Sequence, residues 1–187
     1  MWWRNDRSAV GRFARVAIVI ALGALNAACF QPLYATQTIG GGPGVGTMLA
    51  QVDVDWINVP NGTPDSRIAN EIQNAVKFEL HGGNAISPTH RLNIKMSTTR
   101  SSVITDTLTG RVEAELTGID ASFTLIELAT NKTVMSGRTF SRVGSDYPGQ
   151  QQRFARVRAR LDAEDRAAKV LAENIRTRLA SYFIAGT

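Results

Sequence analysis

The sequence is poor in the residues on which most enzymes and disulfide-stabilised proteins depend. Its 187 residues include one cysteine, Cys29, and two histidines, His81 and His90. A lone cysteine cannot form a disulfide within the chain, so stability has to come from a packed core. No G-x-S-x-G, H-E-x-x-H, paired-cysteine or P-loop pattern occurs. We therefore expect a binding or assembly protein, not an enzyme, with no catalytic residues and no metal site.

A long apolar run is missing as well. Residues 16–25 form a run of ten apolar or small residues, whereas a membrane-spanning helix needs about 20. This run follows four arginines and leads through Ala27 and Ala28 into Cys29. The order of basic, apolar and small residues is that of a secretory signal peptide.

The cysteine at the expected cleavage site resembles the lipobox of bacterial lipoproteins. The resemblance implies that Cys29 becomes the acylated first residue of the mature chain and anchors it to a membrane through lipid, palmitate included. This covalent lipid would be the chain's only added group, since no other cofactor is expected. Asn26 stands where the lipobox usually has a large aliphatic residue, with Leu25 one position earlier. The alternative is an ordinary signal peptide with a free cysteine nearby.

Much of the positive charge lies in this leader. The formal net charge is +5, but residues 1–28 hold four of the 21 Lys and Arg and one of the 16 Asp and Glu, which leaves +2. No basic run remains outside the last helix, so a nucleic-acid partner is not expected. Residues 35–47 contain five glycines and a proline, a composition typical of a flexible tether without core-forming residues. We predict a lipoprotein signal peptide at 1–28, a lipidated tether at 29–49 and a single domain at 50–187.

Hydrophobic periodicity predicts the fold of this domain. Alternating apolar and polar residues predict strands over residues 48–59, 91–105, 111–128 and 132–143. Spacing of three and four residues predicts helices from Thr63 to Gly82 and over residues 151–183. The order β-α-β-β-β-α, with short turns between the last three strands, predicts an α+β fold. In it, two helices pack on a four-stranded, mostly antiparallel sheet.

The pattern also makes three local predictions. In the first strand, Val52, Val54 and Trp56 share the apolar face. In the first helix, Phe78 belongs to the apolar stripe. In the third strand the apolar residues change phase at Gly118, where we expect a bulge or bend that resets the register.

The first third of the last helix is basic and has two interpretations. An arginine cluster there could bind an anionic partner such as a phosphorylated lipid. A solvated helix face is the interpretation we favour, because acidic residues that follow can form ion pairs at i, i+4 spacing. The arginines are Arg153, Arg156, Arg158 and Arg160, and the acidic residues are Asp162, Glu164 and Asp165.

Three stretches resemble the LptE family, the lipopolysaccharide (LPS) assembly lipoproteins of Gram-negative outer membranes. The stretch from Cys29 to Tyr34, CFQPLY, resembles the C-G-F-x-P-L-Y start of the mature family members, without the glycine after the cysteine. The strand start HRLNI at residues 90–94 is similar to the family. So is the last helix at Ala168, Leu171-Ala172-Glu173, Ile175, Arg178-Leu179 and Tyr182-Phe183.

The resemblance implies a function in the outer membrane. A family member is a lipid-anchored plug inside the LptD β-barrel, where it supports barrel assembly and assists LPS delivery to the outer leaflet. The implied partners are therefore an LptD-type barrel, LPS and the membrane, and the implied location is the outer membrane, facing the periplasm. Phe30, which is not Asp, agrees with sorting to the outer membrane. A plug meets a polar barrel lumen, which suits a domain rich in Ser, Thr and Arg.

LPS phosphates favour contacts with arginine and lysine. The candidate LPS-binding residues on the expected sheet are Arg91, Lys95, Arg100, Arg111, Lys132 and Arg138.

Two other functions remain open at this point. A periplasmic lipid-binding lipoprotein that serves an ABC-type lipid transporter shares the anchor and a similar α+β fold, but needs an apolar cavity and an inner-membrane partner. An exported enzyme is the third possibility, and a hydrolase screen would test it.

Overall fold

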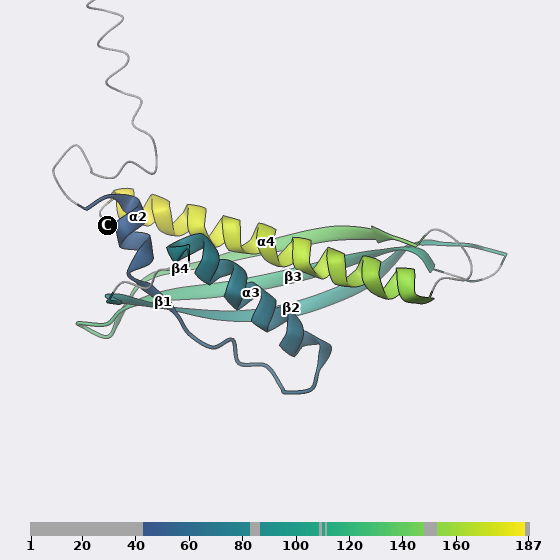
Figure 1. Ribbon diagram of the computed structural model, residues 1–187, viewed down its shortest axis with the longest axis horizontal. Helices are drawn as coiled ribbons and strands as arrows, with labels where there is room; N and C mark the ends of the chain where they lie inside the picture. The colour runs from purple at the N-terminus through teal and green to yellow at the C-terminus, as the bar shows by residue number, and fades with distance from the viewer. Residues whose placement is uncertain (1–42, 83–86, 109, 111, 148–152, 186–187) are drawn as a thin grey trace, which may run out of the picture. The chain divides into compact units, whose positions relative to one another are not determined.

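The computed structural model describes residues 43–82, 87–108, 110, 112–147 and 153–185. Within them the chain forms α2 (Val45–Ala50), β1 (Val52–Val54), α3 (Pro64–His81), β2 (His90–Thr105), β3 (Val112–Glu127), β4 (Lys132–Asp146) and α4 (Arg153–Ala185) (Figure 1). All of these elements belong to one unit. The α+β fold and its β-α-β-β-β-α order are confirmed, with α2 as an additional short helix.

The four strands form one sheet in the order β1-β2-β3-β4. The pairs β2–β3 and β3–β4 are antiparallel and joined by short turns, as the sequence predicts. β1 is parallel to β2, with Val52 opposite His90 and Val54 opposite Leu92, because α3 forms the crossover between them. The sheet is therefore mostly antiparallel.

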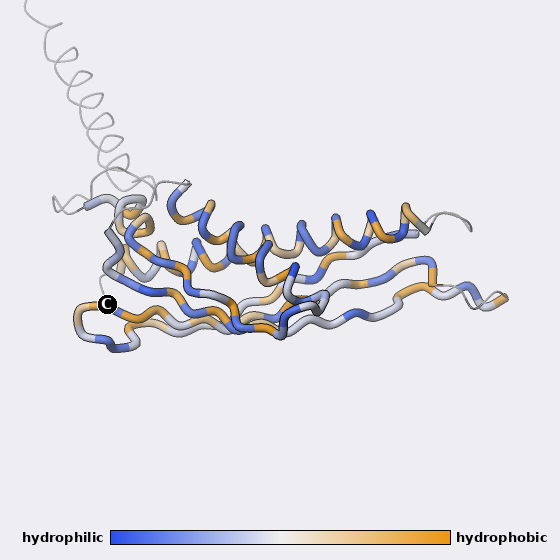
Figure 2. The backbone as a smooth tube through the Cα atoms, turned by 60° about the horizontal axis from the view of Figure 1, so that its bottom comes forward, coloured by the Kyte–Doolittle hydropathy of each residue, from blue (hydrophilic) through white to orange (hydrophobic). Residues whose placement is uncertain are grey.

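Helices α3 and α4 cover one face of this sheet. Figure 2 shows α4 running along one side of the strands, and α4 contacts β3, β4 and α3. Alternate residues of the strands point into this layer, among them Leu92, Ile94, Phe123 and Leu125, which are all buried. A Cβ on Gly137 would lie 2.6 Å from Cζ of Phe123, so a glycine is needed in β4 where the phenylalanine ring lies.

The ends of α3 follow from its sequence. Thr63 precedes the helix in an extended conformation and Pro64 occupies its first turn, where a missing N–H costs nothing. Gly82 ends the helix with φ 55°, and its N–H donates to the carbonyl of Phe78 at 2.8 Å. This left-handed conformation favours glycine. Within the described residues, none of the helices is both long and apolar enough to cross a membrane.

Helix α2 lies in the segment that the sequence predicted as a tether. Val45 and Leu49 are 4% and 2% exposed and belong to the core. The two side chains are four residues apart, so they lie on the same side of the helix. The expectation that residues 35–47 contribute nothing to the core is therefore wrong for Val45. Cys29 and the rest of the predicted tether up to residue 42 lie outside the described residues.

Two aromatic residues expected on apolar faces are exposed. Trp56 is 75% exposed, because β1 ends at Val54 and the chain leaves the sheet after the N–H of Asp55 donates to the carbonyl of Leu92. Ile57 is buried in its place. Phe78 of α3 is 70% exposed. Alternation fails at Trp56 because it applies only as long as the strand continues.

The expected bulge at Gly118 is also absent from β3. Pairing continues without a shift from Thr117 opposite Val143 through Ile119 opposite Ser141. The change of phase has another cause: Leu116 lies on the face away from the helices, while Ile119 and Phe123 point towards them. Thr117 occupies the helix-facing position before Ile119 and is buried. The register shifts occur elsewhere, after Ser102 in β2 and after Leu125 in β3.

Candidate functional site

The face of the sheet away from α3 and α4, here called the open face, carries mainly polar and charged side chains. Side chains on a strand alternate between faces, so the register gives its members. They include Arg91, Asn93, Lys95, Ser97 and Thr99 of β2, Asp120, Ser122 and Thr124 of β3, and Ser136, Arg138, Phe140 and Arg142 of β4. None of these residues falls in the buried class.

Two cations lie in one row across the open face. Lys95 is opposite Ser122, and Ser122 is opposite Arg138. Neighbouring strands are about 4.8 Å apart, which places the two backbones about 10 Å apart. Both residues are exposed, and no salt bridge of the described residues involves either of them. Their long side chains can therefore reach one anionic group placed over Ser122.

A shallow hollow of about 450 Å³ accompanies this row. Its lining includes Lys95, Ser122 and Arg138, together with Asp120 and Phe140 of the next row. Phe140 is 64% exposed and gives the hollow an apolar patch beside the cations. The hollow therefore combines hydroxyl groups, two free positive charges and one aromatic ring, a set that suits a phosphorylated or carboxylated amphiphile.

Arg142 forms a fixed ion pair at the edge of the hollow. Its Nη2 donates to both carboxylate oxygens of Asp120, at 2.9 and 2.8 Å, and its guanidinium carbon lies 5.5 Å from the centre of the Phe140 ring. A Cβ on Gly118 would lie 2.5 Å from Oγ1 of Thr99 and 3.0 Å from Cδ of Arg142. Gly118 therefore leaves the space in which the arginine side chain crosses β3. Because Asp120 is paired in this way, it does not neutralise Lys95 or Arg138.

The structure brings three of the predicted LPS-binding residues to the open face and separates the others. Arg91 shares the face with Lys95 and Arg138, and its Nε lies 4.0 Å from a carboxylate oxygen of Asp53. Arg100 points to the covered face, and Lys132 begins β4 at the β3–β4 turn, opposite Glu127. Arg111 lies outside the described residues.

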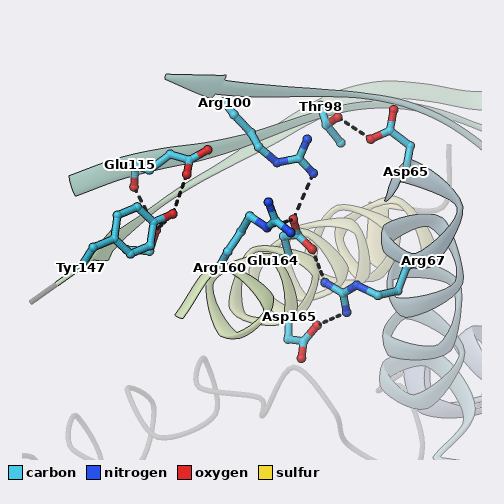
Figure 3. A network of polar contacts seen from close by, with 10 residues as sticks. Asp65, Arg67, Thr98, Arg100, Glu115, Tyr147, Arg160, Glu164 and Asp165 are labelled. Carbon is cyan, nitrogen blue, oxygen red and sulfur yellow. Dashed lines mark hydrogen bonds and ion pairs between the residues drawn. The ribbon is translucent and has the colours of Figure 1, made fainter. Parts of the chain in front are cut away.

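Arg100 instead belongs to an ion cluster between the helices and the sheet (Figure 3). The carboxylate of Glu164 in α4 is 4% exposed and accepts hydrogen bonds from Arg67 of α3 and, at 3.0 Å, from Arg100 of β2. Arg160 lies 3.9 Å from the same carboxylate, and Arg67 also bonds Asp165 at 2.8 Å. A buried carboxylate needs such partners, so this cluster joins three elements.

The pKa values of two residues on this side of the sheet, Arg67 and Tyr147, are shifted. Burial lowers the pKa of Arg67, but its hydrogen bonds to Asp165 and Glu164 and their negative charges outweigh burial and raise it above the ordinary value. Burial also raises the pKa of the Tyr147 hydroxyl, and its hydrogen bond to Glu115 raises that pKa further. Arg67 therefore stays charged and Tyr147 neutral near pH 7, and both act as hydrogen-bond donors.

The basic start of α4 takes part in contacts within the protein. Arg156 donates to the carbonyl of Val112 at 3.0 Å, and its guanidinium carbon lies 4.9 Å from the centre of the Tyr147 ring. One of the predicted i, i+4 ion pairs occurs, Arg160 with Glu164 at 3.9 Å, whereas Asp162 pairs with Arg166, four residues further along α4, at 2.8 Å. Arg158 is exposed.

Sequence reasoning did not select Asp120, Phe140 or Arg142 as parts of a site. A signal was present in β4, where Arg138, Phe140 and Arg142 alternate with Thr139 and Ser141. The alternation shows that the first three share a face, but it cannot show which face the helices cover. The two histidines lie near the start of the sheet: one ring nitrogen of His81 is 2.9 Å from the carbonyl oxygen of Val52, and the His90 ring packs edge-on against Phe183.

No family model and no curated protein matches the chain, but the chain is similar to several solved structures. A candidate lipoprotein from Caulobacter crescentus CB15 is 17% identical with a TM-score of 0.59, and the match covers 76% of this chain and 97% of that one. A minor lipoprotein from Acinetobacter baumannii is 11% identical, with a TM-score of 0.49 and coverage of 70% and 88%. Rare lipoprotein B from Shewanella oneidensis is 14% identical, with a TM-score of 0.47 and coverage of 72% and 97%. The similarity to the Caulobacter protein shows a shared α+β fold.

Proposed function

We propose that the protein is a bacterial outer-membrane lipoprotein that plugs an LptD-type β-barrel, supports its assembly and assists LPS delivery to the outer leaflet. In this proposal Cys29 carries the lipid anchor and residues 50–187 form the plug, facing the periplasm. The protein acts by binding and needs no cofactor beyond the covalent lipid.

The observation that carries the proposal is the open face. Long antiparallel strands present hydroxyl groups and cations on a surface that no described helix covers. A barrel lumen is polar and water-filled, so a plug has to meet it with hydrogen-bonding side chains. LPS also carries phosphates, which Lys95 and Arg138 can bind. Arg91 is a third cation on the same face, and it lies beside Asp53.

Two further points support the same proposal. CFQPLY, from Cys29 to Tyr34, resembles the mature start of the LptE family. The fold is shared with a candidate lipoprotein of Caulobacter crescentus.

Co-purification tests the partner. The full-length protein with a C-terminal tag would be isolated from envelopes solubilised in mild detergent, and the proposal predicts stoichiometric recovery of an outer-membrane β-barrel. Depletion of the protein should lower the amounts of both mature barrel and surface LPS. Recovery of an inner-membrane ABC transporter would support the periplasmic lipid-binding alternative and reject the plug.

The anchor has its own test. Cys29→Ser removes the only thiol, so the variant should lose palmitate labelling and leave the membrane fraction unless the barrel retains it, because stable anchoring requires acyl chains. Ser101→Cys combined with Cys29→Ser is the matched control, since it restores a thiol elsewhere. A Cys29→Ser protein that still incorporates palmitate would reject the assignment.

A further inference from the structure

The two edges of the sheet differ in how they are protected from pairing with another strand. Exposed edges carry unpaired N–H and C=O groups, and natural proteins usually place charges on them or cover them. β4 forms one edge. β2 forms part of the other, because β1 covers only the residues from His90 to Leu92.

One hydrogen bond shows which residues of β2 direct their backbone N–H and C=O groups away from β3. The carbonyl of Leu92 accepts from Asp55 on the β1 side, so even-numbered residues of β2 direct N–H and C=O outward as far as Ser102, where the regular register ends. Thr98, Arg100 and Ser102 therefore have outward groups. Odd-numbered residues such as Thr99 and Ser101 pair with β3.

The edge formed by β4 is protected by arginines. The N–H of Tyr147 donates to Glu113 of β3, so the even-numbered residues of β4 have outward backbone groups. Arg138 is one of them, and Arg166 of α4 donates to the outward carbonyl of Gly144 at 3.2 Å.

The edge formed by β2 over residues 96–102, here called the free edge, lacks this protection. Among the described residues, no backbone group bonds to the outward N–H and C=O groups of this edge. Its one charged residue, Arg100, is held on the covered face by Glu164 at 3.0 Å, and the rest of the sequence from Ser97 to Ser102 is serine and threonine. Residues 99–105 are all exposed. The free edge is as long as an ordinary strand.

We propose that the free edge binds an extended, acidic segment of another protein, which adds to the sheet as a further strand beside β2. β1 already shows this mode of pairing on the same edge, where Asp53 lies opposite Arg91 and within 4.0 Å of it. A strand paired with the free edge that extends one residue further towards β1 lies beside Lys95, the next cation after Arg91 along the open face of β2. An acidic side chain there repeats the pairing of Asp53 with Arg91.

The charge pattern favours a different protein over a second copy of this chain. On the open face β2 carries Arg91 and Lys95 and, from residue 91 to residue 101, no carboxylate. A second copy of β2 would therefore bring no acid to Lys95. The proposal goes beyond the translocon function and does not depend on it, because the partner is defined by strand geometry and charge.

Hydrogen exchange of the purified full-length protein is the first test. Amides of Thr98, Arg100 and Ser102 should exchange at least about tenfold faster than those of Thr99 and Ser101, which bond to β3. Equal protection of both sets would mean that the free edge is already paired, and would overturn the proposal.

Site-specific photo-crosslinking in intact cells is the second test. Benzoylphenylalanine at Thr99, at the free edge, should give one defined adduct, whereas the same group at Ser136, near the protected edge, should not. The adduct should map to a segment of another protein containing Asp or Glu. A synthetic peptide of that segment should then slow exchange of the amides of Thr98, Arg100 and Ser102 by about tenfold or more.

Two variants distinguish strand addition from nearby contact. Ser102→Pro removes an outward N–H without touching the ladder to β3, so it should preserve the melting temperature and abolish the adduct. Lys95→Glu should weaken the adduct several-fold. If Ser102→Pro fails to fold, the exchange measurement with the peptide decides. An adduct of the chain with itself, an adduct unaffected by both variants, or no adduct would overturn the proposal.

Discussion

Alternate residues of the same three strands build two faces of opposite character. On the covered face Leu92, Ile94 and Phe123 are 0%, 3% and 1% exposed. On the open face Lys95 and Arg138 are exposed and have no ion-pair partner among the described residues. A shift of one position along a strand therefore separates a residue that stabilises the fold from one available for binding. The comparison predicts that the cost of a substitution depends on which face the residue occupies.

The largest loss of stability is expected for a substitution on the covered face. Phe123→Ala should lower the free energy of unfolding by about 4 kcal/mol, because it removes a buried ring and leaves a cavity. The neighbouring Gly137 has no side chain to fill that space. Urea denaturation followed by circular dichroism would measure the loss. Phe140→Ala is the matched control, and since Phe140 is 64% exposed its effect should stay within about 0.5 kcal/mol. Equal losses would contradict the division into two faces.

A substitution in the ion cluster around Glu164, on the covered face, should cause a smaller loss of stability. Glu164→Gln removes the charge that Arg67 and Arg100 share, and unpaired charges near the core are costly. Because these arginines are 39% and 29% exposed, we expect a loss of about 2 kcal/mol. Asp162→Asn, whose carboxylate is 66% exposed in its pair with Arg166, should change stability by less than about 0.5 kcal/mol. If both variants behave alike, the cluster adds no more than a surface ion pair.

A still smaller loss of stability is expected for a substitution of Gly118, on the open face. Gly118→Ala should cost about 1 kcal/mol, because the new Cβ meets Thr99 and displaces Arg142 from Asp120. Gly144→Ala is the control in the neighbouring strand, since nothing lies within 4 Å of its added Cβ. Thermal unfolding of the two variants gives the comparison, and an equal shift in melting temperature would show that the arginine moves aside freely.

The sequence was sufficient for the elements whose local signals agree with their packing. Thr63, Pro64 and Gly82 mark the ends of α3, and the spacing of Ala168, Leu171, Ile175 and Leu179 predicts the buried side of α4. β2, β3 and β4 followed from alternation and short turns. In these cases local preference and tertiary packing favour the same structure.

Other features depended on contacts between distant residues. Leu116 and Ile119 look like a break in register, yet they lie on opposite faces of a regular strand, because Thr117 takes a buried position. Arg100 looks like a surface cation, but Glu164, 64 residues further along the chain, draws it to the covered face. Alternation gives the two sets of residues on a strand, and only the packing of α3 and α4 decides which set is covered.

LPS binding by the full-length protein shows whether Lys95 and Arg138 of the open face bind an anionic partner without contributing to stability. Wild type would be compared with Lys95→Glu/Arg138→Glu and with Arg158→Glu, which changes an exposed cation on α4. Unfolding free energies should agree within about 0.5 kcal/mol for all three proteins. LPS affinity should be at least about tenfold lower for the double variant at low salt and unchanged for Arg158→Glu. Wild-type affinity in the double variant, or equal losses in both variants, would show that Lys95 and Arg138 do not form the binding site.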